Sequence, residues 1–121
     1  MSEEQHPLEI DAAQAQRRLA ASAATQLLDV REQYERDGGY IPGSLHIPLG
    51  ELPARAGELD PEAPVIVYCR VGSRSLMAAQ ALDAAGFQAT SLAGGIVDWA
   101  AAGGTLEPEN GFVVDMERGA A

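Results

Sequence analysis

The chain has 121 residues, 46% of them hydrophobic and 21% charged, which suits one globular domain and excludes a disordered chain or a coiled coil. Eighteen acidic and eight basic residues give a formal net charge of −10, which disfavours nucleic acid and anionic membranes as partners. The longest dense apolar run, Pro64 to Cys69, is far shorter than the ~20 residues of a membrane-spanning helix. The single cysteine, Cys69, excludes an intramolecular disulfide and is typical of a reducing compartment, so we expect a cytoplasmic protein.

The N-terminal half of the chain predicts short strands that alternate with helices. Residues Leu8–Ile10 form a short apolar segment that we interpret as a strand. Asp11 follows it, with Gln14 three residues further on, and this capping-box spacing predicts a helix over 12–21. The apolar residues and chain breakers that follow predict a buried strand at Gln26–Val30 and one or two helical turns at Glu32–Arg36. They then predict a second strand at Ser44–Ile47 and a helix at Glu51–Leu59.

The strongest strand in the C-terminal half is Val65–Tyr68, because four consecutive apolar residues suit a central parallel strand that is covered on both faces. A helix over Ser75–Ala85 follows, with Gly86 as its C-terminal stop. One more strand, Phe87–Leu92, and a helix over about 96–102 complete the pattern. This alternation predicts an α/β fold with a parallel sheet that carries helices on both faces.

Composition divides the chain into three parts. Residues 1–7 are acidic and predict a flexible leader, whereas residues 8–104 carry all the alternating elements and form the predicted domain. Residues 105–121 form an acidic tail that proline and glycine interrupt. Residues 112–114 of this tail either dock on the domain as a strand or stay loose.

The loop after the strongest strand carries the residues that point to chemistry, and it reads Cys69-Arg70-Val71-Gly72-Ser73-Arg74-Ser75. Ligands of open α/β sheets bind beyond the carboxyl ends of the strands, which is where this loop lies. A short loop that leads into a helix turns its N–H groups toward an anion, and the helix dipole adds positive potential. Two arginines of the loop add positive charge, and Gly72 permits an unusual backbone conformation. Together these features favour the thiolate form of Cys69, which is a nucleophile at neutral pH.

Three chemistries use such a loop: transfer of a sulfane sulfur, hydrolysis of phosphate monoesters, and reduction of arsenate or disulfides. The spacing from Cys69 to Arg74 is C-x4-R, whereas cysteine-dependent phosphatases need C-x5-R to surround a phosphate. At the phosphatase position this chain has Ser75. Reduction usually needs a second, resolving cysteine, which this chain lacks. The loop therefore favours sulfur transfer.

Five segments recur in the order and spacing of one known family: Leu27–Arg31 (LLDVR), Gly39–Ser44 (GYIPGS), Ile47–Leu49 (IPL), Val67–Ser75 (VYCRVGSRS) and Leu92–Trp99 (LAGGIVDW). Over about residues 8–104 the sequence resembles the rhodanese family, specifically its single-domain sulfurtransferases. The sequence departs from the family pattern at Tyr40, where a histidine is usual. Because the cysteine loop is intact, this departure leaves the expected chemistry unchanged.

The resemblance implies an α/β fold with about five parallel strands, and it implies that Cys69 is the nucleophile that carries a persulfide. It implies that the loop binds the transferred sulfur and its donor through Arg70, Val71, Gly72, Ser73 and Arg74. Asp29, Arg31 and Ser75 are expected to support the site, the first two as an ion pair or loop anchor. We expect neither a metal nor a cofactor, because the sequence has no cluster of cysteine and histidine.

The predicted function is therefore a sulfurtransferase of the rhodanese type. It would move a sulfane sulfur from thiosulfate or a persulfide donor to a thiophilic acceptor, either a thiol or a protein, through Cys69. The alternative is a non-catalytic rhodanese-like module that binds or regulates a partner. The expected partners are a small anionic sulfur donor and a thiol or protein acceptor, with neither nucleic acid nor a membrane.

Overall fold

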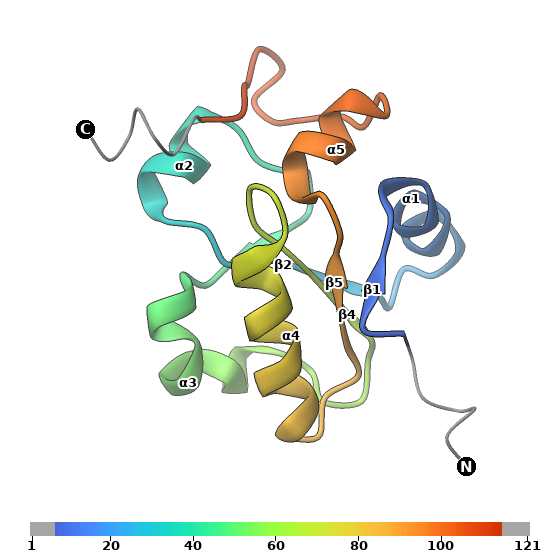
Figure 1. Cartoon of the computed structure of the whole chain (residues 1–121), viewed down its shortest axis with the longest axis vertical. Helices are drawn as coiled ribbons and strands as arrows, with labels where there is room; N and C mark the ends of the chain where they lie inside the picture. Colours follow the sequence, from blue (N-terminus) through green and yellow to red (C-terminus); the bar gives the residue numbers. More distant parts are fainter. Residues whose placement is uncertain (1–6, 115–121) are drawn as a thin grey trace.

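In the computed structural model, which describes residues 7–114, five strands form one parallel sheet in the order β1-β5-β4-β2-β3 (Figure 1). The strands are β1 (Glu9–Ile10), β2 (Gln26–Asp29), β3 (Leu45–His46), β4 (Val65–Tyr68) and β5 (Ala89–Leu92). Strand β4 is central, and Cys69 follows it directly. The cysteine therefore lies at the carboxyl edge of the sheet, as predicted, and the strand order places it between the ends of β2 and β5.

Helices cover both faces of this sheet. They are α1 (Ala12–Ala21), α2 (Gln33–Gly38), α3 (Leu52–Arg55), α4 (Ser73–Ala84) and α5 (Gly95–Ala101), with the short 3-10 helices η2 (Leu49–Glu51) and η3 (Ala56–Glu58). Helices α3 and α4 pack on one face, and α1 and α5 pack on the other (Figure 1). The predicted α/β architecture is confirmed.

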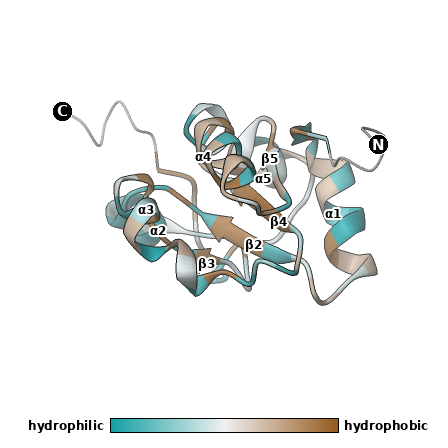
Figure 2. Ribbon diagram, turned by 90° about the horizontal axis from the view of Figure 1, so that it is seen from below, coloured by the Kyte–Doolittle hydropathy of each residue, from teal (hydrophilic) through white to brown (hydrophobic). Residues whose placement is uncertain are grey.

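Successive side chains of β4 point to opposite faces of the sheet and contribute to the core on both faces. Val65 and Val67 join the apolar cluster beneath α3 and α4, whereas Ile66 and Tyr68 join the cluster beneath α1 and α5. All four residues are almost completely buried. Figure 2 shows hydrophobic residues concentrated on the central strands β2 and β4. This two-sided burial explains why β4 is a continuous apolar run, as parallel strands between helical layers are.

Helix α2 ends at Gly38, two residues beyond its predicted end, and two other helices also differ from the predictions. Helix α4 begins at Ser73, two residues before the predicted start, because Gly72 adopts a positive φ of 115° and caps the helix there. The predicted helix Glu51–Leu59 is broken into η2, α3 and η3. Glycines at both ends of α3 disfavour a continuous α-helix, and Pro53 is tolerated only because it lies in the first turn. The capping box predicted at Asp11 is present.

The two terminal parts of the chain are described only in part. Residues 1–6 of the predicted leader and 115–121 of the predicted tail lie outside the described residues. Residues 105–114 lie against the domain, and Leu106 and Val113 pack on the apolar cluster beneath α1 and α5. Within residues 7–114, no helix is long and apolar enough to span a membrane.

Candidate active site

Cys69 is fully buried, and its sulfur lies at the N-terminus of α4. The backbone N–H of Gly72 donates to Sγ at 3.1 Å, and the N–H of Ser75 points to it at 3.4 Å. The first N–H groups of a helix lack partners within the helix and carry the positive end of its dipole. The start of α4 therefore directs two backbone N–H donors at the sulfur.

Two buried serine hydroxyls continue the polar surroundings of the sulfur. Ser75 Oγ lies 3.6 Å from Cys69 Sγ and donates to the Gly72 carbonyl at 3.1 Å. Ser91 Oγ, on β5, lies 2.8 Å from Ser75 Oγ. Because a hydroxyl both donates and accepts hydrogen bonds, Ser75 can bond to the sulfur whether or not the sulfur carries a proton, and Ser91 can bond to Ser75 in either case. The only sign of Ser91 in the sequence is a polar residue within a predicted strand.

Arg74, in the first turn of α4, forms a two-pronged ion pair with Glu35 of α2. Its Nη1 donates to Oε1 at 2.8 Å and its Nη2 donates to Oε2 at 3.0 Å. Glu35 is fully buried, and Arg74 is partly so. The hydrogen bonds and charge of Glu35 raise the pKa of Arg74, and a negative Cys69 raises it further. The guanidinium beside the loop is therefore always charged, and α2 holds it in place.

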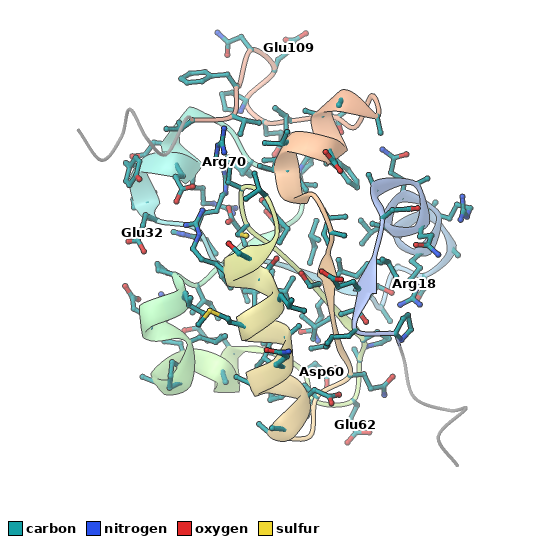
Figure 3. The ribbon with its side chains drawn as sticks, viewed as in Figure 1. Arg18, Glu32, Asp60, Glu62, Arg70 and Glu109 are labelled. Carbon is teal, nitrogen blue, oxygen red and sulfur yellow. The ribbon has the colours of Figure 1, made fainter. Side chains whose placement is uncertain are left out.

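Arg70 lies on another side of the loop and is partly buried. Its Nε donates to the carbonyl of Val114 at 3.2 Å, so its partner is the segment that follows α5 (Figure 3). The neighbouring Val71 is 49% exposed, which is high for a large apolar side chain. The two arginines of the loop are thus held by different parts of the chain, Arg74 by Glu35 of α2 and Arg70 by Val114.

Asp29 and Arg31 form a fully buried ion pair at the end of β2. Arg31 donates to both carboxylate oxygens of Asp29 at 2.9 Å, and to the Gly39 carbonyl at 2.8 Å. The Tyr68 hydroxyl donates to the same carboxylate at 3.1 Å. Burial, followed by the charge of Asp29, raises the pKa of Tyr68 to about 12, which keeps this hydroxyl protonated. Since Tyr68 directly precedes Cys69, the ion pair anchors the backbone that leads into the loop.

The start of α5 packs against the backbone of the cysteine loop. The N–H groups of Ile96 and Val97 donate to the carbonyls of Cys69 and Arg70, at 2.9 and 3.2 Å. Gly95 has a φ of 57°, and a Cβ there would overlap the Arg70 carbonyl oxygen. Glycine at this position therefore permits the close approach that fixes the cysteine loop.

The Rhodanese-like domain model matches residues 11–102, which is most of the chain. The chain belongs to the rhodanese-like family. It is 37% identical over 93 residues to a protein of Allochromatium vinosum named sulfurtransferase, covering 76% of this chain and 87% of that protein. It is 37% identical over 76 residues to the thiosulfate sulfurtransferase GlpE of Coxiella burnetii, covering 62% and 71%. The crystal structure of a rhodanese-related protein from Thermoplasma volcanium superposes with a TM-score of 0.75 at 32% identity, covering 81% of this chain and 95% of that one.

The family membership inferred from the sequence is thus confirmed, and the two relatives given above are named as sulfurtransferases. In this rhodanese-like domain the predicted site residues fall into two groups. Gly72 and Ser75 of the loop contact the buried sulfur of Cys69, whereas Asp29 and Arg31 make their hydrogen bonds at the end of β2. Among residues 7–114, no three acidic, histidine or cysteine side chains gather in a metal-binding arrangement.

We expect the fold to lose the stabilisation that comes from the Glu35–Arg74 ion pair when the pH becomes acidic. Burial alone raises the pKa of Glu35, but hydrogen bonds from Arg74 and the Glu32 amide, with nearby arginine charges, lower it overall from 4.5. A lowered pKa means that the pair stabilises the fold above about pH 4.5, and that this contribution is lost as pH falls below that value. We expect Glu35→Gln to lower the free energy of unfolding at pH 7 by roughly 1.5–3 kcal/mol and to flatten its decline in acid.

Urea unfolding between pH 3 and pH 7 measures this effect. Exposed Glu62→Gln is the matched control, and it should change the stability by less than ~0.5 kcal/mol. An unchanged acid profile in Glu35→Gln would show that the ion pair contributes nothing to the pH dependence.

Proposed function

We propose that this protein is a sulfurtransferase that carries a sulfane sulfur as a persulfide on Cys69. The observation that carries the proposal is the buried sulfur at the N-terminus of α4, with N–H groups of Gly72 and Ser75 directed at it. The relatives named sulfurtransferase support the reaction class. One of them is named for thiosulfate, which supports that anion as a donor.

The reaction is a double displacement. The Cys69 thiolate attacks the outer sulfur of thiosulfate, a new S–S bond forms, and sulfite leaves with the electron pair of the old S–S bond. An acceptor thiolate or cyanide then attacks the terminal sulfur of the persulfide, and the Cys69 thiolate leaves. With a persulfide donor, the leaving group of the first step is a thiolate.

The loop would stabilise charge in both steps. Gly72 and Ser75 already donate to Sγ, and the amides of Val71 and Ser73 make no hydrogen bond to any other group within residues 7–114. These two amides are available to a second sulfur or an anionic donor. Arg74 would oppose negative charge at the loop from its fixed place beside Glu35. Arg70 would attract an anionic donor against the overall charge of −10.

Intact mass after incubation with thiosulfate tests the proposal. We expect the protein to gain one sulfur atom, and cyanide to remove it as thiocyanate. A parallel incubation with a small organic hydropersulfide identifies the donor class. A gain of sulfur only from the hydropersulfide would retain sulfur transfer and exclude thiosulfate as the donor. A gain of sulfur from neither compound would overturn the proposed function and favour a non-catalytic binding module.

A further inference from the structure

The segment that follows α5, residues 105–114, crosses the domain from α5 to the cysteine loop (Figure 1). Tyr40 and Glu107 exchange two backbone hydrogen bonds, at 2.9 and 2.8 Å. Further along, the Phe112 N–H donates to the Gly38 carbonyl at 2.8 Å. The family model ends at residue 102, so this segment lies outside the part of the chain that the model matches.

Two glycines let the segment approach the end of α2. A Cβ at Gly39 would lie 2.7 Å from both the nitrogen and the oxygen of Phe112, and a Cβ at Gly38 would lie 2.6 Å from Val114 Cγ2. Gly39 itself has an extended backbone, with a φ of 164°, which any residue adopts. Glycine at position 39 therefore serves the close packing of the segment and not a special backbone conformation.

The segment reaches the cysteine loop at Arg70. The Nε of Arg70 donates to the Val114 carbonyl at 3.2 Å, and Figure 3 shows this side chain rising from the loop beside the segment. Within residues 7–114, the two terminal nitrogens of Arg70 have no hydrogen-bond partner. The segment thus holds the guanidinium by one edge and leaves its other donors available to a ligand.

We propose that residues 105–114 are a specificity element, which positions Arg70 to bind the anionic group of the sulfur donor. This inference rests on the proposed function, and it adds a role for a segment outside the family match. A free arginine side chain loses much rotational freedom when it binds an anion, and holding it beforehand removes part of that cost. The segment acts through Arg70, so it affects binding of the donor and not the attack by Cys69.

A double-mutant cycle measures this coupling in the full-length protein. Gly39→Ala displaces the segment through its clash with Phe112, and Arg70→Ala removes the group that the segment holds. We expect Gly39→Ala to raise KM for thiosulfate about fivefold and to leave kcat within about twofold of wild type. In the Arg70→Ala background, Gly39→Ala should raise KM by less than about twofold. Gly50→Ala is the matched control, because a Cβ there meets nothing within 4 Å.

A second measurement does not depend on turnover. In nitrogen–proton NMR spectra, the Arg70 Nε–H of the wild type should exchange with solvent more slowly than that of exposed Arg17, and Gly39→Ala should remove this protection. Sulfite, the anionic product, should shift the Arg70 signal.

The outcomes separate the inference from the proposed function. Equal effects of Gly39→Ala on KM in both backgrounds, or a fall in kcat alone, would overturn the inference. Fast exchange of the wild-type Arg70 Nε–H would overturn it too, even if Gly39→Ala failed to fold. If the wild type took up sulfur from neither thiosulfate nor the hydropersulfide, the proposed function would fall. Whenever thiosulfate is not turned over, the sulfite titration would decide the inference: no shift of the Arg70 signal would overturn it.

Discussion

We expect Cys69→Ser to take up no sulfur from thiosulfate and to lose transfer to cyanide by roughly 1,000-fold or more. Cys69 is the only cysteine in the chain, so no other thiol is able to replace it. A serine hydroxyl in this position would meet the same N–H groups of Gly72 and Ser75, but it is a far weaker nucleophile at neutral pH. Intact mass and a thiocyanate assay measure the two losses.

Ser75→Ala is the matched control for this prediction. It removes the hydroxyl that lies 3.6 Å from the sulfur but keeps the nucleophile and the backbone N–H groups. We expect it to keep loading within about tenfold of wild type, because the nucleophile and the N–H groups directed at it remain. Circular dichroism should show that both variants remain folded. Sulfur loading that survives in Cys69→Ser would refute the persulfide on this residue.

Local pattern was enough to predict the fold and the loop. The apolar run of β4 and the glycine-ended helix after it predicted a βαβ arrangement, and the residues around Cys69 predicted an anion-binding turn. Both signals come from neighbours in sequence, whose effects on conformation are local. The predicted start of α4 is two residues late, because the sequence shows a glycine at position 72 but not that its positive φ caps the helix there.

The partners of the loop were not predictable in the same way. Glu35 is 39 residues from Arg74, Ser91 is 16 from Ser75, and Val114 is 44 from Arg70. Each contact depends on how separate elements pack on the sheet, and no local pattern encodes it. The sequence offered only weak hints, such as an acidic residue within α2 and a serine within a buried strand.

Asp29→Ala should have the largest effect on stability. The carboxylate of Asp29 is fully buried and accepts hydrogen bonds from Arg31, Arg36 and Tyr68. Removing it leaves the buried guanidinium of Arg31 without its counter-charge, and such losses cost about 3–5 kcal/mol. The stability of a domain of this size is about 5–15 kcal/mol, so the variant should be marginally folded.

Denaturant unfolding of Asp29→Ala and of the milder Asp29→Asn measures this loss. Asp37→Asn is the control, because Asp37 is exposed and bonds only the Gln33 side chain among residues 7–114; it should cost less than ~0.5 kcal/mol. If Asp29 acts by anchoring the end of β2, loading of Cys69 per folded molecule should stay within about threefold of wild type in Asp29→Asn. A fall of loading by ~100-fold or more with stability retained would instead assign Asp29 a part in the reaction itself, because an anchor affects the reaction only through the fold.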